Sequence, residues 1–110
     1  MEFTQVKIVV TVPPENADAI REALGKAGAG SLGNYSYCSF SVTGTGRFLP
    51  NENAKPHIGT PNKLEIVTEE RIEVICERTH TKKVIAALRA AHPYEEPAID
   101  IYPLLDEKDL

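Results

Sequence analysis

The stretch QVKIVVTV, residues 5–12, predicts a strand in the centre of a sheet. Every second residue is apolar, as on one face of a strand: Val6, Ile8, Val10 and Val12. Val9 adds an apolar side chain to the opposite face, which indicates that both faces of the strand are covered. Pro13 and Pro14 end the strand, and the rest of the fold is expected to be built around it.

An amphipathic helix is predicted directly after this strand, over residues 15–27. Its apolar residues recur at offsets of three and four, the spacing of one helix face: Ala17, Ile20, Leu24 and Ala27. Gly28 and Gly30 follow the last turn, and glycine readily adopts the positive φ angles that end helices. The helix is therefore expected to pack one apolar side against the sheet.

A second strand is predicted over residues 37–43, where apolar and polar residues alternate. Its apolar side chains are expected to face the core: Cys38, Phe40 and Val42. Its hydroxyl side chains are expected to face solvent: Ser39, Ser41 and Thr43. Residues 44–62 then hold three glycines and three prolines, a density of breakers that predicts a long hairpin loop.

Strand character resumes after this loop in two segments, residues 64–67 and 71–77. The polar residues 68–70 lie between the two segments and predict a bend or a β-bulge. We therefore expect the third strand to be interrupted.

A second helix is predicted over residues 82–91, with Thr79 as its N-cap. Its buried stripe consists of three residues: Val84, Leu88 and Ala91. His92 precedes a proline, which disfavours the α-helical conformation and ends the helix. A last strand over residues 98–104 and a solvated acidic tail over residues 106–110 complete the chain.

The order of these elements predicts a single α+β domain over residues 1–110. Strand, helix, strand, strand, helix and strand most simply build a ferredoxin-like βαββαβ sandwich. Its four-stranded antiparallel sheet carries both helices on one face, and the second and fourth strands are the outer ones. Four further apolar side chains are expected to point to the opposite face, or at least not all to share the face of Val6, Ile8 and Val10: Val9, Ile75, Ile99 and Ile101. Such an apolar face indicates contact with another subunit.

Composition and charge exclude several classes of protein. The formal net charge is -4, and the 12 basic residues form no run, which argues against nucleic-acid and membrane partners. No apolar stretch approaches the ~18 residues of a transmembrane helix, and we expect a cytoplasmic protein. Cys38 and Cys76 lie in apolar strands, where we expect buried thiols and no disulfide.

The segment AHPYEEPAIDIYPL, residues 91–104, gathers candidate chemical groups. His92, Glu95 and Glu96 are candidates for a metal site or an acid/base pair. Adjacent carboxylates in an extended loop point in different directions, however, and no histidine or cysteine pair has metal-binding spacing. We therefore expect a rigid turn between prolines, with Tyr94 as a packing or interface residue and the metal site as the weaker alternative.

The long loop is the second candidate region. The sequence GTGR, residues 44–47, lacks the Gly-Lys-Ser/Thr ending and the following helix of a phosphate-binding loop. Its length nevertheless indicates a function, because compact domains rarely contain loops longer than ~12–15 residues. Arg47, Lys55, His57 and Lys63 make this region locally basic, which indicates a small anionic ligand as one alternative. No sequence pattern predicts a cofactor.

Three parts of the sequence resemble the inserted domain of NIF-three-like proteins (the NGG-one interacting factor family). They are AGAGSLGNYS at residues 27–36, GTGRFLP with KPHIG at residues 44–50 and 55–59, and HPYEEPA with DIYPL at residues 92–98 and 100–104. The resemblance covers nearly the whole chain and implies a CutA- or PII-like fold that assembles as a trimer, here as a stand-alone chain. The di-metal chemistry of the family belongs to its flanking domain, so the resemblance implies no GTP cyclohydrolase activity here.

These observations lead to one functional hypothesis and two alternatives. We expect a non-enzymatic, oligomeric regulatory or ligand-sensing module that binds its ligand between subunits. The expected ligand-cleft or subunit-cleft residues are those of the two candidate regions: Arg47, Lys55, His57, His92, Tyr94, Glu95 and Glu96. The alternatives are a divalent-metal-handling protein of the CutA type and a protein-interaction domain that binds no small ligand.

Overall fold

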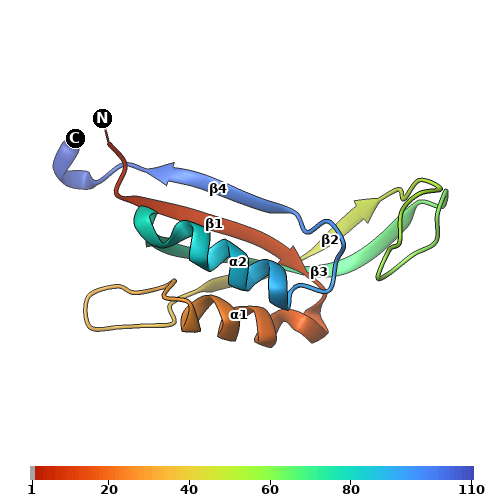
Figure 1. Cartoon of the computed structure of the whole chain (residues 1–110), viewed down its shortest axis with the longest axis horizontal. Helices are drawn as coiled ribbons and strands as arrows, with labels where there is room; N and C mark the ends of the chain where they lie inside the picture. Colours follow the sequence, from red (N-terminus) through yellow and green to blue (C-terminus); the bar gives the residue numbers. More distant parts are fainter. Residues whose placement is uncertain (1) are drawn as a thin grey trace.

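Four strands form one antiparallel sheet in the computed structural model, which describes residues 2–110 (Figure 1). They are β1 (Gln5–Val12), β2 (Phe40–Phe48), β3 (Glu65–Glu77) and β4 (Ile99–Leu104). Their order across the sheet is β2-β3-β1-β4, so β1 and β3 are central and β2 and β4 are the outer strands. This is the predicted ferredoxin-like topology.

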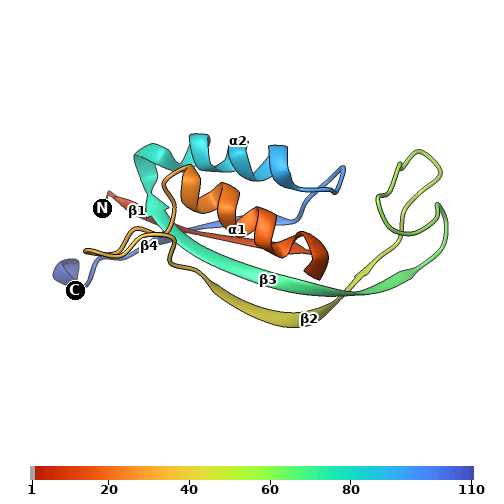
Figure 2. The ribbon, with the colours of Figure 1, turned by 90° about the horizontal axis from the view of Figure 1, so that it is seen from below.

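Two helices, α1 (Ala17–Lys26) and α2 (Thr81–Ala91), cover one face of the sheet, as predicted (Figure 2). Short 3-10 turns precede both helices and end the chain: Pro14–Asn16, Arg78–His80 and Glu107–Asp109. The prediction of Thr79 as the N-cap of α2 was wrong, because the 3-10 turn moves the helix start and His80 occupies the cap position without a side-chain hydrogen bond. No helix within residues 2–110 is long and apolar enough to span a bilayer.

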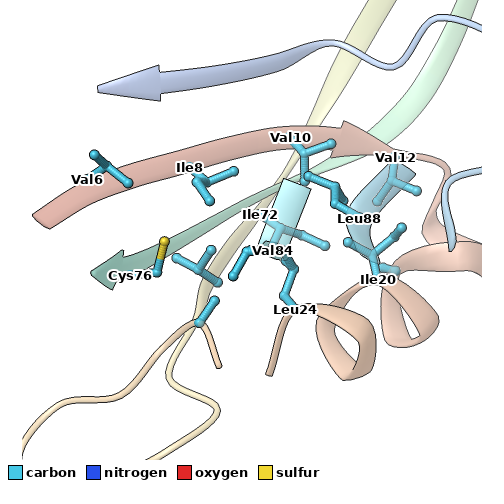
Figure 3. Packing of buried hydrophobic residues seen from close by; sticks show 13 residues of the cluster. Val6, Ile8, Val10, Val12, Ile20, Leu24, Ile72, Cys76, Val84 and Leu88 are labelled. Carbon is cyan, nitrogen blue, oxygen red and sulfur yellow. The ribbon is translucent and has the colours of Figure 1, made fainter. Parts of the chain in front are cut away.

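The hydrophobic core lies between the sheet and the two helices (Figure 3). All four apolar residues of β1 predicted to share one face are buried in it: Val6, Ile8, Val10 and Val12. They pack with side chains of β3, α1 and α2: Ile72, Val74, Cys76, Ile20, Leu24, Val84 and Leu88. Cys76 behaves as an apolar core residue, and burial raises the pKa of its thiol. Both cysteines are free thiols.

The predicted orientation of β2 was wrong. The register pairs Ser41 with Ile72, so Ser41 faces the helices. Phe40 and Val42 point to the opposite face and are 66% and 49% exposed. The physical reason is that β2 is an outer strand, and α1 reaches its inner side through the polar side chain of Arg21.

The prediction for β4 was also wrong in part. Ile99 pairs with Val10 and Ile101 pairs with Ile8, so both isoleucines share the helix-covered face with their partners. Val9 and Ile75 lie on the opposite face, as predicted. We call this uncovered side of the sheet the open face, and its register positions include Lys7, Val9, Phe40, Val42, Arg71, Glu73, Ile75 and Tyr102.

Charged side chains cross the middle of the open face. Glu73 pairs with Lys7 at 3.2 Å and with Arg71 at 3.2 Å. Four apolar or aromatic side chains of the same face remain exposed around this network: Phe40, Val42, Ile75 and Tyr102. The open face is therefore a mixed surface with an ionic centre and an apolar surround.

Strands β2 and β3 extend beyond the rest of the sheet as a hairpin arm, residues 44–69 (Figures 1 and 2). The register is continuous from Phe40 opposite Glu73 to Phe48 opposite Glu65, so the bend predicted at residues 68–70 does not occur. The loop predicted from residue 44 begins after Phe48 instead. The arm gives the molecule its elongated dimensions of 48 × 28 × 23 Å.

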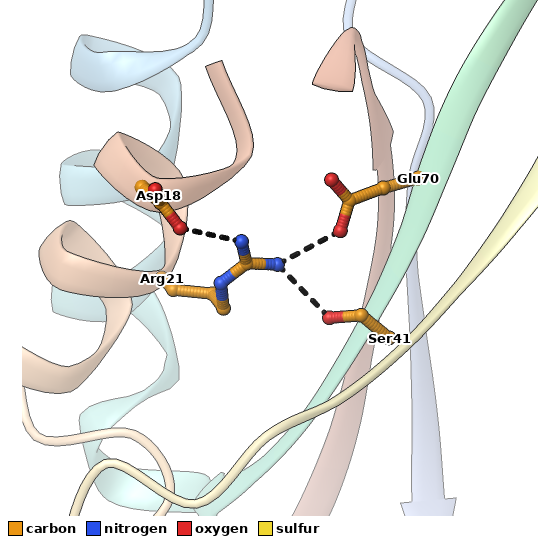
Figure 4. A network of polar contacts seen from close by, with 4 residues as sticks. All are labelled: Asp18, Arg21, Ser41 and Glu70. Carbon is orange, nitrogen blue, oxygen red and sulfur yellow. Dashed lines mark hydrogen bonds and ion pairs between the residues drawn. The ribbon is translucent and has the colours of Figure 1, made fainter. Parts of the chain in front are cut away.

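Arg21 of α1 braces the base of the hairpin arm (Figure 4). Its guanidinium donates hydrogen bonds to Ser41 Oγ of β2 at 3.1 Å and to Glu70 Oε1 of β3 at 3.0 Å. A third bond, at 2.7 Å, joins it to Asp18 on the same helix. One side chain therefore links the helical layer to both strands of the arm.

Candidate ligand-binding groove

A groove of about 560 Å³ opens between the hairpin arm and the segment that joins α2 to β4. Strand β1 ends opposite Glu70, so β3 has no β1 neighbour along residues 65–69. The connecting segment, which we call the 92–98 turn, lies beside this part of the arm. Both sides contribute lining residues, among them Phe48, Leu49, His57, Ile58 and Glu69 from the arm and Tyr94, Glu95, Glu96 and Ala98 from the turn.

The 92–98 turn is fixed to the sheet by His92. Helix α2 ends before this residue, which takes an extended conformation ahead of Pro93, as predicted. The His92 side chain is buried, and its Nε2 lies 2.8 Å from the carbonyl oxygen of Thr11. The backbone N–H of Tyr94 donates to Nδ1 at 3.1 Å.

These two contacts determine the protonation state of His92. Because the Tyr94 N–H can only donate, Nδ1 must be the acceptor and Nε2 must carry the proton. The ring is therefore the neutral tautomer, and burial lowers its pKa. With both nitrogens engaged, His92 acts as a structural residue that orients the turn.

Tyr94 connects the turn to the hairpin arm. Its hydroxyl donates to Glu69 Oε2 at 2.9 Å. Its ring lies 4.9 Å from the ring of His92, 6.2 Å from that of His57 and 6.4 Å from that of Phe48, measured between centroids. Burial, with the hydrogen bond to Glu69, raises the pKa of Tyr94, so the side chain remains a neutral phenol.

Glu95 makes the second link across the groove. Its Oε2 accepts a hydrogen bond from the backbone N–H of Lys55 at 2.9 Å. The loop of the arm is closed by a further bond of 2.6 Å from the Asn62 N–H to the Pro50 carbonyl oxygen. Asn62 has a φ of 65°, a conformation that asparagine tolerates better than most residues.

Gly46 makes room for one of the groove carboxylates. A Cβ atom at this position would collide with the Glu69 side chain. The glycine that resembled part of a phosphate-binding loop therefore lies inside β2, where it allows Glu69 to reach Tyr94.

The structure brings together most of the predicted cleft residues. Five of them line the groove: Arg47, His57, Tyr94, Glu95 and Glu96. The buried ring of His92 contacts Thr11 and is not among the lining residues, and Lys55 contacts Glu95 through its backbone N–H. Sequence reasoning missed Phe48 and Glu69, because it assigned residue 48 to a loop and residue 69 to a bend. A continuous β2–β3 register would have placed both on one face.

Within residues 2–110, no group of three or more histidine, cysteine, aspartate or glutamate side chains is arranged so that it could hold a metal ion. The alternative metal site of His92, Glu95 and Glu96 would need a ring nitrogen of His92 as a ligand. Both ring nitrogens already have hydrogen-bond partners.

Comparison with known proteins shows that the chain is similar to one part of proteins of the NIF3 type. A protein of Halalkalibacterium halodurans named GTP cyclohydrolase 1 type 2 homolog is 54% identical over 101 residues, which is 92% of this chain. The crystal structure of a Bacillus cereus protein related to NIF3 matches 94% of this chain at 48% identity, with a TM-score of 0.83. This chain is related to the NIF3 family. It spans about a quarter of the length of these relatives, 27% of the first and 26% of the second.

More distantly related solved structures share the fold of this chain. A CutA protein from Archaeoglobus fulgidus matches 93% of this chain and 85% of its own length, at 21% identity and a TM-score of 0.68. Bacillus subtilis GlnK matches 92% of this chain and 85% of its own length, at 15% identity and a TM-score of 0.62. The predicted CutA- and PII-like fold is confirmed. No protein-family model matches the chain.

Proposed function

We propose that this NIF3 relative is a non-enzymatic regulatory or ligand-sensing module that binds a small ligand in the groove between the hairpin arm and the 92–98 turn. The observation that carries the proposal is the construction of the groove. Its two sides come from segments about 40 residues apart in sequence, which are joined across it by the hydrogen bond from Lys55 to Glu95. A ligand that contacts both sides would change how the arm is held.

The hairpin arm is well placed to pass the effect of ligand binding on to another molecule. It projects from the body, and its loop carries side chains that are largely exposed, including Leu49 and Leu64 at 64% and 58%. A partner or a second subunit that contacts the arm would respond to its position. Binding in the groove would thereby be coupled to assembly or to partner binding.

Two residues support a non-enzymatic role. His92 and Tyr94 are the groups in this region best suited to proton transfer. Both ring nitrogens of His92 are engaged, and the Tyr94 phenol is kept neutral by burial and by Glu69. The cyclohydrolase name belongs to relatives about four times as long, and this chain offers the sensing groove rather than a proton-transfer pair.

We further propose that the module is a homotrimer. The open face exposes Phe40, Val42, Ile75 and Tyr102, and the CutA- and PII-like fold supports the three-fold assembly that the sequence resemblance implies. The exposed apolar residues of this face would then lie between subunits.

The ligand proposal is tested by thermal shift against nucleotides, divalent metals, amines and short peptides. A specific ligand at ~100 times its dissociation constant adds roughly 2.7 kcal/mol to the free energy of unfolding. We expect Ala98→Phe, which fills the groove, to abolish this stabilisation. Ala86→Phe is the matched control, since Ala86 is exposed on α2. The proposal fails if no compound stabilises the protein or if Ala98→Phe leaves the stabilisation unchanged.

A further inference from the structure

Three carboxylates dominate the charge of the groove. Glu69, Glu95 and Glu96 line it, whereas Arg47 is the single lysine or arginine among its described lining residues. With histidine neutral, the lining carries a formal charge of -2. The groove is therefore acidic, although the loop that forms one of its sides is locally basic in sequence.

Arg47 makes no ion pair with these carboxylates within the described residues. In the β2–β3 register, Arg47 pairs with Ile66 and Phe48 pairs with Glu65. Successive residues of a strand point to opposite faces, so the Arg47 side chain leaves β2 on the side opposite to Phe48. Phe48 belongs to the groove side, because its ring approaches that of Tyr94.

One of the three carboxylates has no partner within the described chain. Glu69 accepts a hydrogen bond from Tyr94, and Glu95 accepts one from Lys55. Glu96 is exposed and makes no hydrogen bond or ion pair with another residue of 2–110. Its carboxylate is available to a molecule in the groove.

Aromatic rings form the other chemical feature of the groove. The ring of Tyr94 lies 6.4 Å from that of Phe48 and 6.2 Å from that of His57, with interplanar angles of 53° and 51°. Aromatic faces attract cations because their π electrons are negative. Apolar side chains such as Ile58 and Leu49 complete the lining. Carboxylate, ring and apolar contacts thus occur within one cavity.

We propose that the groove binds a small organic cation, an ammonium group carried on an apolar or aromatic body. The ammonium group would pair with Glu96, and the body would pack against the rings. This inference rests on the proposed function, because it names the ligand class for the same groove. It replaces the small anion that the basic loop residues predicted.

The experiment compares three probes that differ mainly in charge. They are 2-phenylethylamine, which is a cation at neutral pH, its neutral isostere 2-phenylethanol, and the anion phenylacetate. Each is titrated into the ¹⁵N-labelled full chain and followed by NMR. We expect shifts in the amides of the arm and of the 92–98 turn, with the amine binding about three- to tenfold more tightly than the alcohol and phenylacetate most weakly.

A variant tests the role assigned to Glu96. Glu96→Gln should weaken binding of the amine by about threefold to fivefold and leave binding of the alcohol unchanged. Glu107→Gln is the control, an exposed carboxylate in the 3-10 turn at the C-terminal end of the chain. This control should bind the amine like the unmodified protein.

The outcomes separate the two proposals. Tighter binding of phenylacetate, or equal binding of all three probes at the groove, overturns the inference of a cationic ligand and leaves the groove as a ligand site. An amine preference that survives in Glu96→Gln overturns the contact with Glu96. If no probe shifts any groove amide, this inference is wrong, while the thermal-shift panel separately decides the proposed function.

Discussion

His92 holds the 92–98 turn in place through both nitrogens of its ring. One hydrogen-bond partner, Thr11, precedes His92 by 81 residues, and the other, Tyr94, follows it by two. A buried ring that must stay neutral makes the stability of the turn depend on pH. The contact with Thr11 also connects the groove to the end of β1.

We predict that acidification destabilises the protein through His92. Burial lowers its pKa in the folded state, whereas in the unfolded state the ring takes up a proton near its ordinary pKa of about 6.5. The contribution of His92 to the free energy of unfolding is therefore complete above that pH. It is lost as the pH falls toward the pKa of the folded state. Urea unfolding at pH 7.5 and pH 5.5 should show a smaller free energy of unfolding at the lower pH.

The variant His92→Gln isolates this effect. It can retain a donor for Thr11 but cannot titrate, so it should lose part of the pH dependence. His80→Gln, at a histidine with a 48% exposed side chain, should retain that dependence. Identical pH dependence in His92→Gln and the unmodified protein would contradict the role assigned to His92.

The sequence was sufficient to predict the 92–98 turn but not the contacts that hold it. The proline after His92 and the bracketing proline at 97 were sufficient to predict a rigid turn. Local sequence carries no information on the Thr11 carbonyl or on Glu69, because both are brought to the turn by the sheet register. For the same reason, local sequence could not show that Glu69 joins Glu95 and Glu96 in the lining of the groove.

The hairpin arm is the element on which the proposed function depends. It leaves the body where β1 ends, and beyond that point β2 and β3 have only each other as sheet neighbours. Arg21 supplies side-chain hydrogen bonds between the helical layer and the base of the arm.

We predict that Arg21→Met loosens the base of the arm. Methionine keeps much of the apolar stem but removes the hydrogen bonds to Ser41 and Glu70. The loss should be about 1 kcal/mol in the free energy of unfolding, because the side chains are only partly buried. Amide hydrogen exchange should accelerate in residues 41–47 and 67–70.

Arg89→Met provides the comparison, since Arg89 is exposed in the last turn of α2. It should change neither the stability by more than a few tenths of a kcal/mol nor the exchange of the arm. Equal exchange rates in the arm for both variants would show that Arg21 does not brace it.

The elements themselves were largely predictable, but their orientation was not. The alternation in residues 37–43 identified a strand, yet alternation cannot tell which of its two faces the helices cover. Phe40 and Val42 are on the uncovered face because β2 is an outer strand. Glycine in the sequence GTG likewise favoured a loop, although Gly46 lies inside β2, where a Cβ atom would collide with the Glu69 side chain as it stands.

The molecule as a whole has one face that its own helices do not cover. The order of elements predicted this arrangement, and the solved CutA and GlnK structures share it. The open face combines exposed apolar side chains with the ion pairs of Glu73. Subunit association through this face is the central expectation at this scale.

We predict that a charge on the open face disrupts the proposed trimer. Phe40→Glu places a carboxylate near Glu73, its register partner on β3, and burial of this charge between subunits would be unfavourable. Sedimentation velocity at micromolar concentration should show a trimer for the unmodified protein and a smaller species for the variant. Leu110→Glu, at the exposed C-terminal residue, should remain a trimer. Only monomer in the unmodified protein would refute the assembly.

The arm is long enough for a small rotation near Arg21 to move its far end by several ångströms. From Ser41 to Phe48, β2 runs seven residues beyond the brace, a length of about 24 Å at roughly 3.4 Å per residue. A rotation of about 10° at the brace therefore displaces the far end by roughly 4 Å, which exceeds the length of a hydrogen bond. A small change at the base of the arm can thus alter which contacts its far end makes.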